Sequence, residues 1–266
     1  MSDVSAVRTY RYLRIGIVAL VVLLGASVLR EMIWGVGWLG SISEYYYSPV
    51  RNVFVGVLFA TGLSLVVIKG HGVEDALLNG AGILAPIIAV VPMQLESGDG
   101  TYAFPAGTSE AVANNVVSLA VVALVGLAFA AWTLTRVRSA DRAAAERGLA
   151  GAVVLIAAFL LWFLVDSGSF ERAAHFVAAI GLFGIFVVVA WINSDQTLMS
   201  RGAIVYRAIS IGMAVIALIA VVFGVLELTD HRPFDHWLFV VEMLLLGLFS
   251  AFWLLQTFEY WDEGGA

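Results

Sequence analysis

HWLFVVEMLLLGLFSAFWLLQ, residues 236–256, is long and apolar enough to cross a lipid bilayer as a single helix. It nevertheless contains an acidic residue, Glu242, which lies about 9 Å from His236 at the usual helical rise. Ionisable groups at such a depth are costly and usually face a bundle interior or a wet cavity. The stretch therefore predicts a transmembrane helix with an inward-facing carboxylate.

Apolar runs of this kind recur along the whole chain of 266 residues, which is 61% hydrophobic and 13% charged. Soluble domains are about 25% charged, and the strands of a transmembrane β-barrel would alternate polar and apolar residues. The sequence therefore predicts an all-α, polytopic transmembrane helical bundle that forms one integral membrane domain over residues 1–266. We expect about eight spans, at 13–36, 52–69, 76–94, 113–135, 148–166, 173–192, 204–227 and 236–258.

The basic residues distribute unevenly between the two sides of these expected spans. One side carries Arg8, Arg11, Arg14, Lys69, Arg136, Arg138, Arg142, Arg147, Arg201 and Arg207. The other side carries only Arg30, Arg51, Arg172 and Arg232. Because loops rich in lysine and arginine stay in the cytoplasm, we expect both termini to be cytoplasmic and the protein to lie in the plasma membrane.

The composition excludes several classes of site. The chain has no cysteine, which excludes disulfides and thiolate-bound metals. We predict no cofactor, and no nucleic-acid partner because no basic groove with interleaved aromatic residues is present. The net charge is −6, with a single lysine, and this balance resembles that of halophilic proteins.

Polar residues gather at the expected external ends of the spans, whereas the cytoplasmic half of the expected bilayer has almost nothing comparable. The candidate binding residues are Glu242, His175, Arg51, Asn52, Ser43, Glu44 and Asp166. Their similar depth predicts a shared polar pocket that opens outward. Glu242 has three candidate partners there: Arg51 as an ion pair, His175 through a shared proton, or a ligand. The alternative is a structural contact between helices.

A membrane lipid is the ligand that this pocket would suit best. Arg51 would hold an anionic headgroup, since arginine binds phosphate through two parallel hydrogen bonds. Glu242 and His175 would orient the ligand or share a proton. The leading hypothesis is therefore a protein that binds, or helps to process, a lipid headgroup or a small amphiphile.

Three other functions stay open. His231 and His236, together with His175 and an acidic group, could hold a zinc ion in a membrane-embedded hydrolase or transferase, although their spacing matches no strong zinc motif. A proton-coupled transporter would need ionisable groups on both sides of the membrane. A structural or accessory subunit would work through a second copy of the chain or another membrane protein.

Two prolines interrupt the expected span 76–94. Pro86 and Pro92 stand in the stretch ILAPIIAVVP. Because proline has no amide hydrogen, it frees backbone carbonyl groups that a neighbouring helix or a cavity must satisfy. A bend beside the polar pocket would follow.

Four stretches resemble blocks of uncharacterised prokaryotic multi-pass proteins and, more distantly, of the DRAM and FGF-receptor-activating-protein family. They are SISEYYYSPVRNVFVGVLFATG (41–62), LNGAGILAPIIAVVP (78–92), AAHFVAAIGLFGIF (173–186) and HWLFVVEMLLLGLFSAFWLL (236–255). The matching positions are Ile42, Ser43, Asn79, Ala81, Gly82, His175 and Glu242. The resemblance implies a helical membrane protein tied to lipid handling, and it brings no catalytic residues.

The chain departs from that family in two respects. The related proteins have about six spans, so the expected spans 113–135 and 148–166 would be an insertion. Family members also tend to carry Pro-Glu before the second span, where this chain has Pro49-Val50-Arg51-Asn52.

Overall fold

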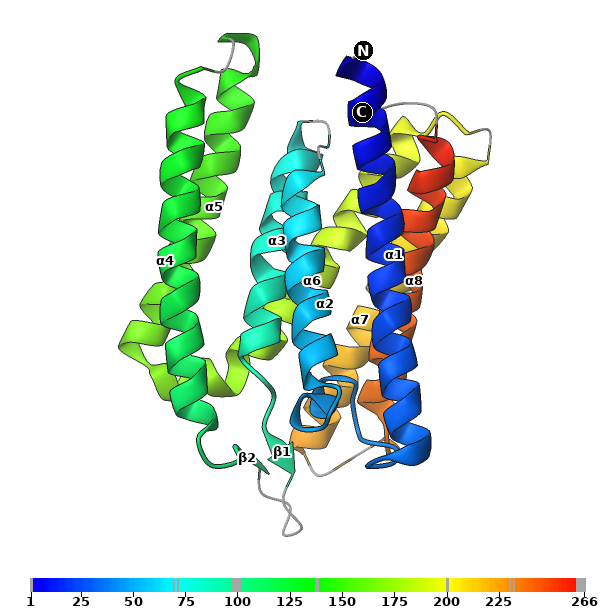
Figure 1. The fold of residues 1–266 in the computed structure, drawn as a ribbon. Coiled ribbons are helices and arrows are strands. Elements are labelled where there is room, and N and C mark those ends of the chain that lie inside the picture. The colour runs from blue at the N-terminus through cyan, green and yellow to red at the C-terminus, as the bar shows by residue number, and fades with distance from the viewer. Residues whose placement is uncertain are drawn as a thin grey trace.

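The computed structural model describes residues 2–68, 70, 72–96, 102–136, 139–199, 201–229, 231 and 233–261. Within these residues the chain forms eight α-helices, one 3₁₀ helix and one two-stranded hairpin (Figure 1). The elements are α1 (Ser2–Trp34), η1 (Ser43–Tyr47), α2 (Arg51–Val67), α3 (Val73–Val90), β1 (Leu95–Glu96), β2 (Tyr102–Ala103), α4 (Thr108–Leu134), α5 (Ser139–Val165), α6 (Ser167–Gln196), α7 (Gly202–Leu228) and α8 (Trp237–Glu259).

Seven of these helices are long and apolar enough to cross a membrane. The remaining one, α2, is apolar and has 17 residues, which is at the short end of what spans a bilayer. The chain is therefore an all-α, multi-pass membrane protein, as its sequence predicts. Three basic residues used for the predicted orientation, Lys69, Arg138 and Arg232, lie outside the described residues.

Each of the eight predicted spans falls on one helix, but α3 ends at Val90, four residues before the predicted end of its span. Proline disfavours the helical conformation of the residue before it. Val91 precedes Pro92 and is extended, with φ −109° and ψ 91°. Pro86, by contrast, lies inside the helix.

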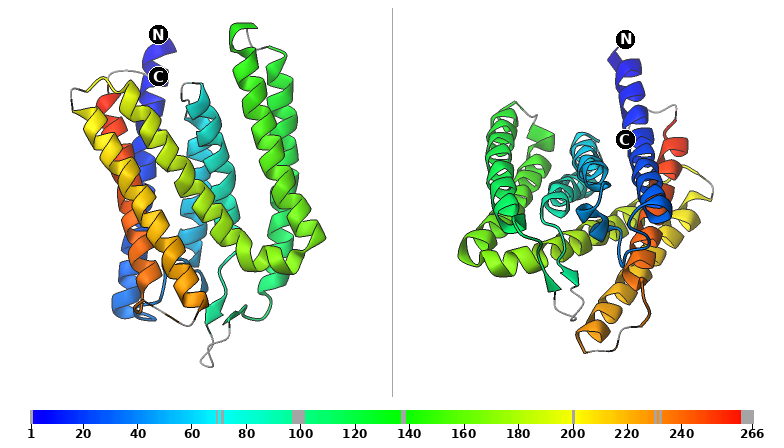
Figure 2. Two further views of the ribbon diagram at one scale, coloured as in Figure 1. Left: turned by 180° about the vertical axis from the view of Figure 1, so that it is seen from behind. Right: turned by 60° about the horizontal axis from the view of Figure 1, so that its bottom comes forward.

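The helices form a main bundle with a helical hairpin at one side. Helices α4 and α5 make this hairpin, and α1 with α8 lies at the opposite side of the molecule (Figure 1). Helix α6 runs obliquely across the back, from the α4–α5 hairpin to α7 (Figure 2). Helix α3 occupies the middle, because it packs against α2, α5 and α6.

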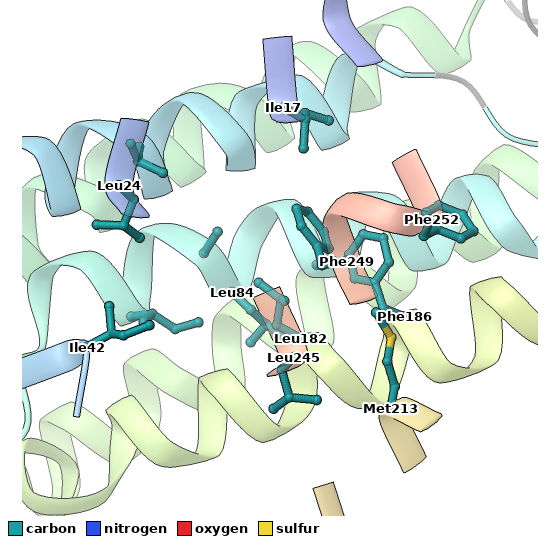
Figure 3. Packing of buried hydrophobic residues seen from close by; sticks show 14 of the residues in the cluster. Ile17, Leu24, Ile42, Leu84, Leu182, Phe186, Met213, Leu245, Phe249 and Phe252 are labelled. Carbon is teal, nitrogen blue, oxygen red and sulfur yellow. The ribbon is translucent and has the colours of Figure 1, made fainter. Parts of the chain in front are cut away.

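The core of the main bundle is built from apolar side chains on α1, α2, α3, α6, α7 and α8. At its centre the ring of Phe186 on α6 meets the rings of Phe249 and Phe252 on α8 edge to face (Figure 3). Edge-to-face ring pairs add stabilisation beyond the area that they bury. A smaller cluster, which includes Val90, Val112 and Phe170, joins the hairpin side to α3 and α6.

Helices α2 and α3 are in close backbone contact at two glycines. A Cβ atom at Gly62 would lie 2.8 Å from the carbonyl oxygen of Gly82, and one at Gly82 would lie 2.7 Å from that of Gly62. Small residues allow this kind of backbone contact between membrane helices.

The start of α1 and the end of α8 lie at the same end of the bundle, which we call the terminal end (Figure 1). There, Arg11 donates a hydrogen bond to the backbone carbonyl of Trp261, and its guanidinium lies 4.2 Å from the centre of the Trp261 ring. The opposite end holds η1, the β-hairpin and the starts of α6 and α8, and we call it the η1 end.

Candidate functional site

Glu242 lies on the second turn of α8 and contacts the segment that enters η1. Its carboxyl group accepts hydrogen bonds from the backbone N–H groups of Ile42 and of Ser43, the latter at 3.4 Å. Its Oε1 atom lies 2.8 Å from Oγ of Ser43. The carboxylate predicted to face inward is therefore bound to protein groups that are distant in sequence.

The start of α8 holds this segment in place. The backbone N–H of Phe239 donates to the carbonyl of Gly40 at 2.9 Å. Nδ1 of His236 lies 3.0 Å from the carbonyl oxygen of Leu39, and the His236 ring stacks on Trp38 at 4.8 Å. These contacts fix the irregular stretch between α1 and η1 beside Glu242.

His175 continues the hydrogen-bond chain from Ser43 towards α3. Its Nε2 atom lies 3.0 Å from Oγ of Ser43, and its Nδ1 atom lies 2.7 Å from the carbonyl oxygen of Val91. Only 3% of His175 and 5% of Ser43 is exposed. The network formed by Glu242, Ser43, His175 and the Val91 carbonyl, here called the Ser43 network, thus connects α8, η1, α6 and the end of α3.

The hydrogen-bonding capacities of the Ser43 network require one shared proton. A carbonyl oxygen only accepts, so Nδ1 of His175 carries a hydrogen. Ser43 has a single hydroxyl hydrogen and cannot donate to both Glu242 and His175. Both contacts are satisfied when Glu242 is a carboxylic acid and His175 is neutral, or when Glu242 is ionised and His175 is an imidazolium. Neither arrangement leaves a net charge in the Ser43 network.

Arg51 does not pair with Glu242, although the sequence made it a candidate partner. Its guanidinium donates to the hydroxyl of Tyr46 at 2.7 Å and lies 4.4 Å from the centre of that ring. Among the described residues it makes no ion pair within 4.0 Å. The partner of Glu242 is instead Ser43, through which it reaches His175.

Arg51 and Asn52 line a groove of about 320 Å³ between α2, α3 and α4, here called the Arg51 groove. The other residues that line it are Tyr46, Val55, Gly56, Ala89, Val90 and Asn115. Glu242, Ser43 and His175 are not among them. The predicted single pocket is therefore divided into a buried hydrogen-bond network and an open groove that lies beside it.

Two other predicted site residues have local structural roles. Asp166 is exposed, and its Oδ1 atom accepts the backbone N–H of Ser169 at 2.9 Å, which caps the start of α6. Glu44 accepts the backbone N–H of Gly40 at 2.8 Å. Neither residue lines the Arg51 groove.

The histidines considered for zinc do not meet. His231 contacts the carbonyl oxygen of Thr229, and His236 contacts that of Leu39. In the part of the chain that the structure describes, no group of three histidine, aspartate or glutamate residues is placed to hold a metal ion.

The three consecutive tyrosines of η1 point in different directions. The hydroxyl of Tyr45 donates to the carbonyl of Gly37 at 2.7 Å, and that of Tyr47 donates to the carbonyl of Met93 at 2.9 Å. Burial raises the pKa of both hydroxyls, that of Tyr47 to about 12. Tyr45 and Tyr46 are buried, so these two rings belong to the core.

The terminal end contains a second buried polar cluster, which contradicts the expectation that this half of the membrane lacks such groups. Nδ2 of Asn193 donates to Oε1 of Glu74 at 2.7 Å, and Nε2 of Gln256 donates to Oδ1 of Asn193 at 2.7 Å. Arg14 lies near Glu74 and is 2% exposed. We call these four residues the Asn193 cluster.

Sequence reasoning missed the Asn193 cluster because Glu74, Asn193 and Gln256 each stand within about one turn of a helix end, where polar residues are usually exposed. Asn193 lies in α6 and Gln256 in α8, next to apolar runs, and this was the one signal that could have identified them. The aromatic rings around Phe249 separate this cluster from Glu242, which lies about 21 Å from Gln256 along α8.

Comparison with known proteins adds no relative to this description. No family model, no curated protein and no solved structure matches the chain.

Proposed function

We propose that the protein binds the anionic headgroup of a membrane lipid, or of another amphiphile, in the Arg51 groove. The observation that carries this proposal is the state of Arg51. Its guanidinium has five N–H donors, lies at an open groove, and is held by a tyrosine and not by a carboxylate. A phosphate or carboxylate group can therefore take the donors that Tyr46 leaves free.

The lining of the groove matches an amphiphile in the order of its polar and apolar parts. Arg51 and Asn52 stand at the start of α2, at the η1 end. Val55 and Gly56 lie one helical turn deeper on the same helix, opposite the apolar end of α3. A headgroup would bind at the start of α2, and the first atoms of its apolar chain would contact the deeper wall.

The Ser43 network supports this groove from behind. Tyr46, which holds Arg51, belongs to the same 3₁₀ helix as Ser43. Val90, which lines the groove, precedes the residue whose carbonyl contacts His175. The network thus fixes two walls of the groove. Arg51 and Asn52 would contact the ligand, while the Ser43 network would hold the groove in shape.

The experiment is native mass spectrometry of delipidated protein titrated with phosphatidylglycerol and, separately, with phosphatidylcholine. The variant Gly56→Leu places a bulky side chain at the wall of the groove, at a position where the added Cβ itself meets no atom within 4 Å. Gly184→Leu is the matched control, since Gly184 on α6 is equally unobstructed and lies outside the groove.

We expect wild type and Gly184→Leu to retain phosphatidylglycerol in preference to phosphatidylcholine. Gly56→Leu should lose this binding, and Arg51→Gln should lose the preference for the anionic lipid. If Gly56→Leu and Gly184→Leu retained phosphatidylglycerol equally, the lipid would not bind in the Arg51 groove. If Arg51→Gln kept the same preference for phosphatidylglycerol as wild type, Arg51 would not be the residue that binds the anionic headgroup.

We also infer that both termini face the cytoplasm and that the η1 end faces the outside of the plasma membrane. The excess of arginine at the terminal end supports this orientation. The chain has no cysteine, so a single introduced thiol can be labelled without background. A membrane-impermeant maleimide added to intact cells should label Ala106→Cys at the η1 end and not Ala144→Cys on α5. The reverse pattern would invert the orientation.

A further inference from the structure

Ser43 and His175 have the geometry of a nucleophile and its base, a feature that the lipid-binding proposal does not use. Oγ of Ser43 lies 3.0 Å from Nε2 of His175, and a third group, the Val91 carbonyl, orients the imidazole through Nδ1 at 2.7 Å. This is the arrangement that activates serine for attack on a carbonyl carbon. With its hydrogen on Nδ1, neutral His175 presents a lone pair on Nε2 to the Ser43 hydroxyl.

The carboxyl group of Glu242 lies where an acyl group would lie in such a site. Its Oε2 atom is bound by two consecutive backbone N–H groups, those of Ile42 and Ser43. Its Oε1 atom lies 2.8 Å from the Ser43 hydroxyl oxygen. Backbone N–H pairs beside a nucleophile stabilise the oxyanion that forms during acyl transfer. A carboxylic acid product would place its two oxygens in the same way.

We propose that Ser43 is the nucleophile of an ester-hydrolysing site for the carboxylic esters of amphiphiles, with His175 as its general base, and that Glu242 occupies the acyl position in the closed state described here. The substrate reaches this site when the Glu242 side chain withdraws. Glu242 is only half-buried, whereas Ser43 beneath it is 5% exposed.

The reaction needs water as its only co-reactant. The Ser43 oxygen forms a bond to the acyl carbon, while its proton passes to Nε2 of His175. The bond from the acyl carbon to the alcohol oxygen then breaks, and the alcohol leaves with the proton from His175. A water molecule attacks the acyl-serine, gives one proton to His175, and the acid leaves as Ser43 regains its hydrogen.

The test uses a fluorophosphonate probe, which reacts covalently with activated serine, on the full-length protein in mild detergent. Peptide mass spectrometry then reads the adduct on Ser43 and on every other serine of the same sample. The variants are Glu242→Ala, which empties the acyl position, and Glu242→Asp, which withdraws the carboxyl group by one methylene if the alanine variant does not fold. Each is also combined with His175→Gln.

We expect the Ser43 adduct to form slowly in wild type and about tenfold or more faster when Glu242 is shortened. Adding His175→Gln should slow it again by about 100-fold, as the loss of a general base does. A folded Glu242 variant without a Ser43 adduct would overturn the proposal, as would labelling that is indifferent to His175. If neither variant folds, the wild type decides: the absence of a Ser43 adduct after prolonged exposure to the probe would overturn the proposal. A purely structural Ser43 network would give no labelling in any variant.

Discussion

The carbonyl oxygen of Val91 lies 2.7 Å from Nδ1 of His175, at the point where α3 ends. Pro92 produces this contact, because it stops the helix and keeps Val91 extended. A carbonyl group that a longer helix would have used internally is therefore free for α6. Pro92 thus fixes the orientation of the His175 ring. The hydrogen that Nδ1 of His175 donates to the Val91 carbonyl also fixes the tautomer. Among the described residues, His175 is the only histidine in the bundle interior.

Replacement of Glu242 by glutamine should be tolerated, whereas replacement by leucine should not. A glutamine amide can accept from the Ile42 N–H and donate to the Ser43 hydroxyl, as a carboxylic acid at this position would. We expect Glu242→Gln to change the free energy of unfolding by about 1 kcal/mol or less. Leucine leaves the Ile42 N–H without a partner and should cost about 1–3 kcal/mol.

Thermal unfolding in one detergent, followed by tryptophan fluorescence, compares the two variants. Met243→Leu is the control, because Met243 is the exposed neighbour of Glu242 on α8. Equal loss of stability in the glutamine and leucine variants would show that the network needs an ionised carboxylate. Two variants as stable as wild type would show that it contributes nothing to stability.

Tyr47 should make the folded state less stable in alkali. Its pKa is raised by burial to about 12, while an unfolded tyrosine loses its proton near pH 10. From about pH 10 to about pH 12 the folded state therefore binds a proton that the unfolded state has lost, and stability falls as the pH rises. Its contribution is fully present below about pH 10.

The comparison is Tyr47→Phe, measured by thermal unfolding across this range. At neutral pH the variant lacks the hydrogen bond to the Met93 carbonyl and should be less stable by about 1 kcal/mol. Between about pH 10 and about pH 12 its unfolding temperature should fall less steeply than that of wild type. Parallel slopes would contradict the linkage to Tyr47.

The sequence predicted the helices well and the site only in part, for a physical reason. Apolar length is a local property, so it identified α8 and the other helices from single stretches. Depth is also local, and it correctly grouped Glu242, Ser43 and His175 at one end of the bundle. The direction in which a side chain faces depends on the neighbouring helices, and for this reason Arg51 could not be separated from the Ser43 network.

The Asn193 cluster also shows that the sequence of one helix does not reveal the partners of its side chains. Glu74 lies in the first turn of α3, where acidic residues usually favour the helix dipole and face water. Only the packing of α3 against α6 reveals that it is buried and hydrogen-bonded to Asn193. Periodicity within one helix carries no information on such a partner.

Alanine should be destabilising at Gly62 and at Gly82 but not at Gly56. The added Cβ at either of the first two positions would lie less than 3 Å from a backbone carbonyl oxygen of the neighbouring helix, which cannot rotate away. We expect a cost of about 1–3 kcal/mol for the resulting shift of α2 against α3. At Gly56 the methyl group meets open space, and alanine is the better helix former by about 1 kcal/mol.

Unfolding temperatures of the three alanine variants in the same detergent test this contrast. Because all three are glycine-to-alanine changes in α2 or α3, differences in intrinsic helix propensity cancel. If Gly62→Ala and Gly82→Ala were as stable as Gly56→Ala, the two helices would not be in the close contact described here.

Asn193→Leu should lower the free energy of unfolding more than most single substitutions, because the Asn193 side chain is hydrogen-bonded to both Glu74 and Gln256. The leucine would leave Oε1 of Glu74 and the amide of Gln256 without this partner in a buried position. We expect a loss of about 2 kcal/mol or more, since two buried hydrogen bonds are lost and each costs about 1–3 kcal/mol when one partner is removed. Asn114→Leu on the exposed face of α4 is the matched control and should stay within about 0.5 kcal/mol of wild type. The double variant Asn193→Leu, Gln256→Leu should recover part of the loss, because it also removes the Gln256 amide that has lost its bond to Asn193. Equal unfolding temperatures for Asn193→Leu and Asn114→Leu would mean that water already satisfies the cluster at the terminal end.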